Sequence, residues 1–254
     1  MILAIDIGNS NVTLGGFDGD ELVFVANIST DTSATKDEYS IKILNVLNLY
    51  GIDTKAIKGA VMSSVVPQLN MTVKSAVKFL IGIDTLTVGP GVKTGISIQC
   101  DTPSSVGADL ICASVAAYFI YEKPALIIDL GTATKMTVVN GKGAFIGTSI
   151  LPGVAMGLNA LSNETAQLPK VSLEAPASVI AKNTVDCIKS GIIYGNASMI
   201  DGMTERIKNE SGEELSVYIT GGYAPAVLPY CKQKMTHDEN LVLKGLNIIY
   251  KKNS

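Results

Sequence analysis

Two short segments of the chain place an aspartate, a glycine and hydroxyl-bearing residues at matching positions. The first is Ile5-Asp6-Ile7-Gly8-Asn9-Ser10-Asn11, and the second, 123 residues later, is Ile128-Asp129-Leu130-Gly131-Thr132-Ala133-Thr134. A carboxylate at a strand end beside a glycine turn can hold a hydrated cation, while nearby N–H groups and hydroxyls can face phosphate oxygens. Either segment alone reads more simply as a hairpin turn. Their repetition favours a clamp for a nucleotide and its ion.

The surrounding sequence predicts the elements that position these turns. Each turn follows a short apolar run and precedes another β-rich segment, at 12–17 and at 136–139. Apolar residues recur at helical spacing over 39–50, where Gly51 ends the run, and over 185–207. Self-similarity at about half the chain length predicts two related α/β halves that face one another.

The predicted helix over 185–207 carries a stripe of small residues, namely Gly191, Gly195, Ser198 and Gly202. Glycine inside a helix costs about 1 kcal/mol relative to alanine, so the stripe requires a packing reason. Close approach of another helix supplies one. The pattern alone does not decide whether that helix belongs to the same chain or to a second subunit.

Two further segments complete the predicted site. A strand over 215–219 runs into Thr220-Gly221-Gly222, where paired glycines let the backbone approach a flat ligand such as adenosine. Asp109 precedes an apolar run and should lie in the first turn of a helix, whose positive end keeps a carboxylate ionised. It could accept a hydroxyl proton during phosphoryl transfer, or it could merely complement the helix dipole.

Composition narrows the remaining classes of function. The 254 residues are 47% hydrophobic with a formal net charge of −3, which predicts a globular protein without a nucleic-acid partner or a membrane partner. The longest apolar run, 110–121, is shorter than the roughly 20 residues that span a bilayer, and no leader pattern is present, so we expect a cytoplasmic protein. Four widely spaced cysteines predict free thiols. The single histidine, His237, excludes catalytic systems that need several and is interpreted as a solvated loop residue.

The ordered motifs resemble a known family. D-x-G-N, D-x-G-T and T-G-G in that order resemble the acetate kinase, sugar kinase, Hsp70 and actin superfamily, which implies an α/β fold of duplicated ribonuclease-H-like domains with ATP in the cleft between them. With VGAD at 106–109 and the long segments at 150–169, 181–202 and 240–250, the whole chain is similar to the type III pantothenate kinases, also called the Bvg accessory factor family. The expected halves are 1–118, with the first phosphate turn and the base, and 119–254, with the second turn, the adenosine motif and the dimer helices.

This resemblance implies ATP-dependent phosphorylation of pantothenate, the first step of coenzyme A biosynthesis, by a homodimer that completes the substrate pocket across its interface. Asp109 would be the catalytic base. Asp129 would hold a monovalent cation, K⁺ or NH₄⁺, and Asp6 would hold Mg²⁺ through the phosphates. The expected ATP-binding residues are Asp6, Ile7, Gly8, Asn9, Ser10, Asn11, Val12, Thr13, Thr132, Gly221 and Gly222. The expected pantothenate-binding residues are Cys100, Gly107, Ala108, Asp109, Leu110 and Thr184.

Three positions depart from the family pattern. Leu110 replaces the arginine of the usual G-A-D-R, and Cys100 stands where a tyrosine commonly faces the substrate. Leucine cannot supply the missing charge. Lys135 follows the second turn where a small or polar residue is usual, and its ammonium either reaches a phosphate or is solvated. The alternative function is therefore a divergent paralogue, a nucleotide-binding regulatory protein with altered substrate or low activity.

Overall fold

The computed structural model describes residues 1–254, which form two compact units. Unit 1 comprises Met1–Ile120 and Asn240–Ser254, and unit 2 comprises Tyr121–Glu239. The sequence predicted that everything after residue 118 belongs to the second half. Helix α7 (Leu241–Asn253) differs from this prediction, because its apolar residues Leu243, Leu246 and Ile249 pack into a core of unit 1.

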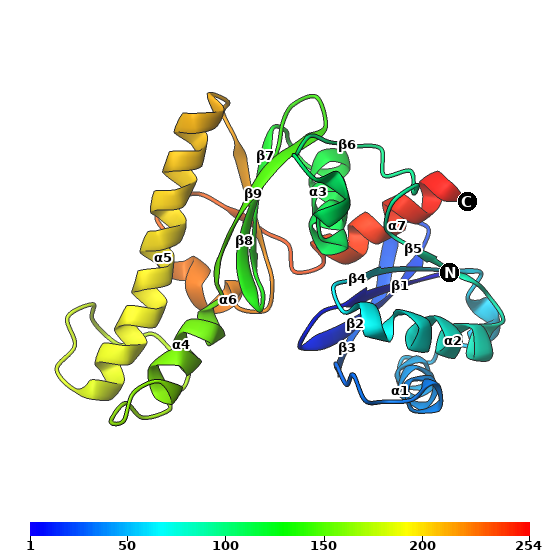
Figure 1. Cartoon of the computed structure of the whole chain (residues 1–254), viewed down its shortest axis with the longest axis horizontal. Coiled ribbons are helices and arrows are strands. Elements are labelled where there is room, and N and C mark those ends of the chain that lie inside the picture. The colour runs from blue at the N-terminus through cyan, green and yellow to red at the C-terminus, as the bar shows by residue number, and fades with distance from the viewer. The chain divides into compact units, whose positions relative to one another are not determined.

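Unit 1 is built on a five-stranded sheet with the order β3-β2-β1-β4-β5 (Figure 1). Strand β1 pairs antiparallel with β2 and parallel with β4. Its residues alternate between the two faces of the sheet: Leu3 and Ile5 belong to one hydrophobic core and Ala4 to another. The strands are β1 (Ile2–Ile7), β2 (Asn11–Asp18), β3 (Glu21–Ser29), β4 (Gly59–Ser64) and β5 (Thr85–Thr87).

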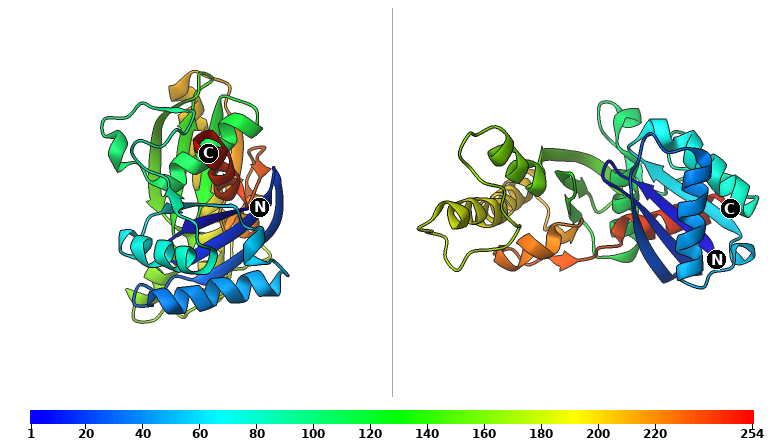
Figure 2. Two further views of the ribbon diagram at one scale, coloured as in Figure 1. Left: turned by 90° about the vertical axis from the view of Figure 1, so that its right-hand side faces the viewer. Right: turned by 90° about the horizontal axis from the view of Figure 1, so that it is seen from below.

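Two pairs of helices cover the faces of this sheet. Helices α1 (Lys36–Leu49) and α2 (Asn70–Ile81) supply one core, and α3 (Ala108–Ile120) and α7 supply the other (Figures 1 and 2). Helices α3 and α7 approach each other closely at Gly245, where an added Cβ would collide with the backbone of Cys112. The close packing of α3 against α7 in unit 1 therefore depends on Gly245.

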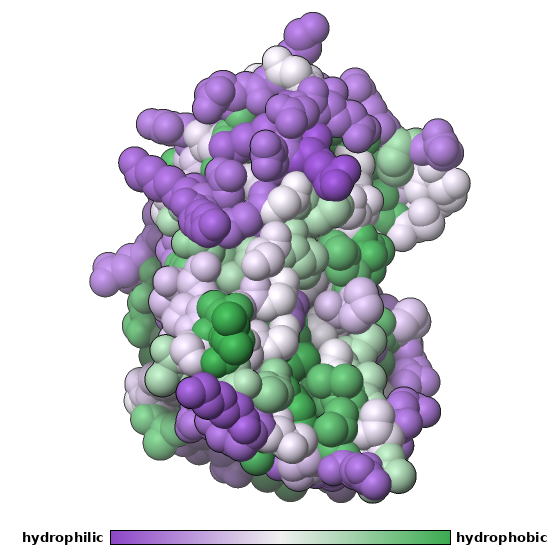
Figure 3. Space-filling view, turned by 90° about the vertical axis from the view of Figure 1, so that its left-hand side faces the viewer, coloured by the Kyte–Doolittle hydropathy of each residue, from purple (hydrophilic) through white to green (hydrophobic).

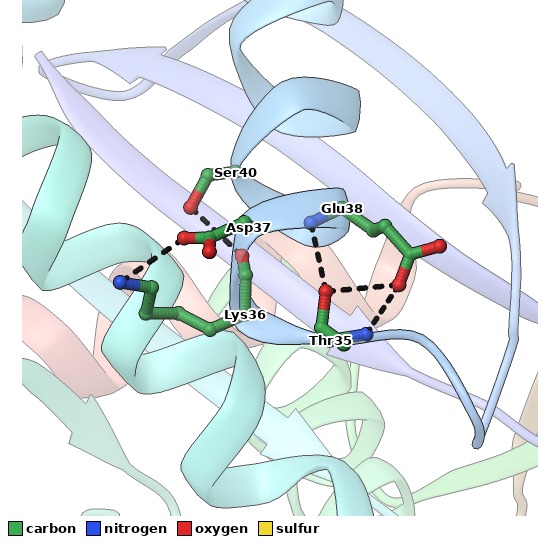
Figure 4. Close-up of polar contacts among 5 residues, drawn as sticks. All are labelled: Thr35, Lys36, Asp37, Glu38 and Ser40. Carbon is green, nitrogen blue, oxygen red and sulfur yellow. Dashed lines mark hydrogen bonds and ion pairs between the residues drawn. The ribbon is translucent and has the colours of Figure 1, made fainter.

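Helix α1 begins with a capping box (Figure 4). The Glu38 amide donates to Thr35 Oγ1 at 3.3 Å, and the Thr35 amide donates to Glu38 Oε2 at 2.7 Å. The Thr35 hydroxyl also donates to Glu38 Oε2, at 2.9 Å, and the two hydrogen bonds that this carboxylate accepts, first from the Thr35 backbone and then from its side chain, lower the pKa of Glu38. The helix predicted over 39–50 is confirmed, and it begins at Lys36. The capping box sets this start because its reciprocal hydrogen bonds satisfy backbone N–H groups that have no partner within the helix.

Unit 2 repeats the strand arrangement of unit 1. Strands β9-β8-β7-β10-β11 lie in this order, and β7 pairs antiparallel with β8 and parallel with β10, as β1 does with β2 and β4. The predicted duplication of an α/β half is confirmed. These strands are β7 (Ala125–Leu130), β8 (Ala133–Val139), β9 (Ala144–Pro152), β10 (Ser216–Thr220) and β11 (Thr236–His237); β6 (Ser97–Ile98) is a further two-residue strand.

Helices α4 (Val154–Asn163), α5 (Thr184–Ser211) and α6 (Ala224–Val227) pack with one face of this sheet. The glycine stripe of α5 has no intrachain partner: Cβ atoms added at Gly191, Gly195 or Gly202 would meet nothing within 4 Å. Figure 3 views the side of the molecule that carries α5, where apolar residues gather below a hydrophilic upper end. No helix of the chain combines the length and the apolar character that a membrane crossing requires.

Candidate active site

The first predicted turn lies at the end of β1 and joins it to β2. Asp6 is the penultimate residue of β1, opposite Thr13 on β2 and Ser63 on β4. The Ser63 hydroxyl donates to Asp6 Oδ1 at 2.6 Å. The turn is closed by a 2.9 Å hydrogen bond from the Gly8 amide to the Asn11 carbonyl, and the Thr30 hydroxyl donates to the Gly8 carbonyl at 2.6 Å. The segment is thus a hairpin turn that holds a carboxylate at a fixed place beside it.

The side chains of this turn divide into core and surface residues. Asn9, Ser10 and Asn11 are exposed, whereas Ile7 and Val12 are fully buried and can offer a ligand only their backbone. Thr13 donates its hydroxyl hydrogen to Asn27 Oδ1 at 2.7 Å. Among the predicted ATP-binding residues of this turn, the exposed polar side chains are therefore the ones a phosphate group can reach.

Asp109 lies in the first turn of α3, as predicted. Its carboxylate folds back over Gly107, where an added Cβ would collide with Oδ1. One turn further along α3, Cys112 is completely buried, and burial raises the pKa of its thiol well above the ordinary value. The carboxylates of Asp6 and Asp109 raise this pKa further, whereas the Ser63 hydrogen bond lowers it. Asp6 and the predicted base, Asp109, thus both belong to unit 1 and both act on the buried Cys112 thiol.

The other predicted pantothenate residues are spread over the two units. Cys100 is partly exposed in the loop before α3, Gly107 and Ala108 are partly exposed at the start of that helix, and Leu110 is buried with 8% of its surface accessible. Thr184 is the exposed first residue of α5 in unit 2.

The second turn joins β7 to β8 and carries a different partner for its aspartate. Asp129 lies directly opposite Lys135 on β8. Lys135 Nζ is 2.6 Å from Asp129 Oδ2, and each side chain is 17% exposed. Lys135 occupies the register position that Thr13 occupies in unit 1, so the duplicated sites differ at this point.

Glycines from two other segments abut the second turn. Gly221 has φ +93°, and an added Cβ would lie 2.6 Å from Asp129 Oδ1. A Cβ on Gly153 would collide with the carbonyl group of Thr132. The Tyr223 amide donates to the Leu130 carbonyl at 3.1 Å. The T-G-G segment therefore lies against the aspartate of the turn, with Gly222 and Thr132 exposed.

Sequence reasoning missed Ser63 and Gly153 and left two alternatives for Lys135. Ser63 is brought to Asp6, 57 positions away in the sequence, by the parallel pairing of β4 with β1, which no local pattern reveals. Lys135 lies opposite Asp129 because three residues, 131–133, separate the paired residues Leu130 and Thr134, and a hairpin loop of that length would have assigned it. The predicted free thiols are confirmed, and His237 is exposed but lies in β11 rather than in a loop.

Comparison with known proteins identifies the family. The family model described as type III pantothenate kinase matches residues 2–206. A type III pantothenate kinase of Geotalea daltonii is 41% identical over 253 residues, covering 100% of this chain and 99% of the relative, and one of Moorella thermoacetica is 39% identical over 254 residues with full coverage of both chains. The chain belongs to the type III pantothenate kinases. This confirms the family indicated by the sequence motifs.

Solved structures support the fold of this family member. Component A of (R)-2-hydroxyglutaryl-CoA dehydratase from Acidaminococcus fermentans superposes with a TM-score of 0.61 at 16% identity, covering 100% of this chain and 99% of that one. The ROK hexokinase of Thermus thermophilus superposes with a TM-score of 0.53 at 11% identity, covering 100% and 99%. The fold is that of the two-domain actin-like ATPases and sugar kinases.

The family uses ATP with a divalent metal, and the residues present fit both. Mg²⁺ is usually held by one or two carboxylates together with phosphate oxygens, and Asp6 is a partly exposed carboxylate beside the β1–β2 turn. The close approaches at Gly153 and Gly221 leave no space for side chains, so backbone alone lines those parts of the second turn.

Proposed function

We propose that this chain transfers the γ-phosphoryl group of ATP to pantothenate and forms 4'-phosphopantothenate, the first step of coenzyme A biosynthesis. The observation that carries the proposal is the repeated strand-end carboxylate, Asp6 and Asp129, in two sheets that share the order of five strands within a type III pantothenate kinase. Asp6 and the exposed polar residues of its turn are assigned to the phosphates and Mg²⁺. Thr132 and the Gly221-Gly222 segment are assigned to the second half of the nucleotide site.

Asp109 is assigned as the proton acceptor. The pantothenate hydroxyl oxygen forms a bond to the γ-phosphorus, the bond from that phosphorus to the β-phosphate oxygen breaks, and the hydroxyl proton moves to the Asp109 carboxylate. Mg²⁺, when bound with ATP, neutralises the phosphate oxygens. The carboxylate lies in the first turn of α3, at the positive end of the helix dipole. Gly107, Ala108 and Leu110 flank this group and, with Cys100 and Thr184, are assigned to the pantothenate pocket.

The proposed assembly is a homodimer that uses the α5 face. Gly191, Gly195 and Gly202 have open space beside them, and a hollow of about 250 Å³ is lined by Gly153, Gly157 and two of these glycines. Glycines in a helix interior are costly unless another surface packs closely against them. A second copy of the chain would supply that surface.

The deciding experiment follows formation of 4'-phosphopantothenate from ATP and pantothenate by the purified chain. We expect turnover by the wild type and a decrease of about 10²–10⁴-fold in kcat for Asp109→Asn, with the Kd for ATP nearly unchanged. Asp37→Asn is the matched control, because Asp37 is also an acidic residue in the first turn of a helix. Near-normal kcat in Asp109→Asn would refute its role as the base. ATP binding by the wild type without turnover would support the regulatory alternative instead.

A further inference from the structure

The ion pair between Lys135 and Asp129 is built into the second turn. The two residues face each other across the β7–β8 hairpin, and Lys135 Nζ lies 2.6 Å from Asp129 Oδ2. Both side chains are 17% exposed, so the pair is largely withdrawn from solvent. A charged group in such a position is stable only when it is paired, which ties the lysine to this carboxylate.

The other oxygen of the carboxylate faces the glycine turns. Cβ atoms added at Gly131 and Gly221 would lie 3.3 Å and 2.6 Å from Asp129 Oδ1. The positive charge of Lys135 therefore lies beside the backbone of the turn assigned to the nucleotide. In unit 1 the equivalent aspartate, Asp6, accepts from the hydroxyl of Ser63.

We propose that the Lys135 ammonium is a built-in monovalent cation of the nucleotide site, so that ATP binding and turnover need no added K⁺ or NH₄⁺. This rests on the proposed function of the second turn as part of that site. A primary ammonium carries the same single charge as K⁺ or NH₄⁺ and donates hydrogen bonds to carboxylate oxygens.

The ion pair disagrees with the expectation that Asp129 holds a free cation. Oδ2 already contacts an ammonium, and a second cation at the same carboxylate would be repelled by it. A free ion must also be recruited from solution at each binding event, whereas the lysine is held in place by the strand. The chemistry of this site thus favours the tethered charge over a dissociable one.

The test measures the Kd for ATP-Mg²⁺ by calorimetry in KCl and in tetramethylammonium chloride at equal ionic strength. We expect equal affinity for the wild type in both salts. Lys135→Ala removes the tethered charge, so its ATP affinity should fall about tenfold or more in tetramethylammonium chloride and recover when K⁺ or NH₄⁺ is added. Lys142→Ala, at an exposed lysine in the β8–β9 turn, is the control and should behave as the wild type.

Lys135→Met provides a second variant that keeps the aliphatic bulk, and circular dichroism checks that both variants fold. Wild-type ATP binding that requires K⁺, or folded Lys135 variants that bind ATP equally in both salts, would overturn the inference. The binding readout is independent of pantothenate. The wild type could bind ATP equally in both salts, and the Lys135 variants could respond to K⁺ as expected, while no 4'-phosphopantothenate is formed. That result would support the inference about Lys135 and refute the proposed kinase activity.

Discussion

The contact between α3 and α7 allows one substitution to be worked through in detail. Gly245 of α7 lies against Cys112 of α3, and an added Cβ would stand 2.5 Å from the carbonyl carbon of Cys112 and 2.9 Å from its Cα, with the carbonyl oxygen still closer. Contacts below 3.0 Å require a shift, and backbone atoms cannot rotate away as a side chain can. Gly245→Ala must therefore separate the two helices.

The magnitude follows from two opposing effects. Overpacking a core costs about 1–3 kcal/mol, and the rigid obstacle places this site near the upper value. Alanine recovers about 1 kcal/mol of helix propensity relative to glycine. The free energy of unfolding should fall by about 2 kcal/mol, which corresponds to roughly 4–8 °C in Tm for a protein of this size.

Urea unfolding followed by circular dichroism measures this change. Gly157→Ala is the matched control, since Gly157 also lies in a helix but its added Cβ would meet only Ile192 Cδ1 at 3.8 Å. It should leave stability unchanged or raise it by up to about 1 kcal/mol. Because α3 also carries Asp109, Gly245→Ala should lower kcat as well. A Gly245→Ala protein as stable as the wild type would refute the close packing of α3 on α7.

Two further predictions concern the α5 face and the thiols. Gly195→Leu fills the open space beside α5 and should weaken self-association about tenfold or more in sedimentation experiments. Asn209→Leu, near the end of the same helix, is the control and should not weaken it. If Gly195→Leu dimerises as strongly as the wild type, the interface lies elsewhere. A thiol reagent added to the native protein at pH 8 should modify the exposed Cys187 but not Cys112, as measured by mass spectrometry. Cys112 should react only after urea unfolds the chain, because it is buried and the pKa of its thiol is raised. Cys231, whose pKa is raised to about 11 mainly by burial, should react slowly until the pH approaches that value. Rapid native labelling of Cys112 would contradict its burial.

Local patterns were sufficient to predict much of the fold. The start of α3 before its apolar run, the helix ending at Gly51 and both aspartate-glycine turns depend on neighbouring residues, and the structure has all of them. The duplication was visible because the two turns carry the same residue types in the same order. The shared order of five strands in the two sheets agrees with it.

Contacts between distant segments could not be predicted in this way. The hydrogen bond from Ser63 to Asp6 depends on the pairing of β1 with β4, and Gly153 reaches Thr132 only after β8 and β9 have formed. The return of α7 to unit 1 likewise depends on tertiary packing, since its apolar residues join a core formed by residues far away in the sequence. The sequence therefore predicted the turns of the site better than the partners of their aspartates.

The division of unit 1 between the two ends of the chain has a consequence for synthesis on the ribosome. Unit 2 is continuous from Tyr121 to Glu239 and has all its residues before Asn240–Ser254 are translated. Unit 1 lacks α7 until Asn240–Ser254 leave the ribosome, so one face of its sheet, with Ala4 and Val61, has no α7 covering until then. Unit 1, whose first residues are synthesised before those of unit 2, is thus the unit that completes its folding last. Nascent chains stalled near residue 240 should expose that apolar face to chaperones.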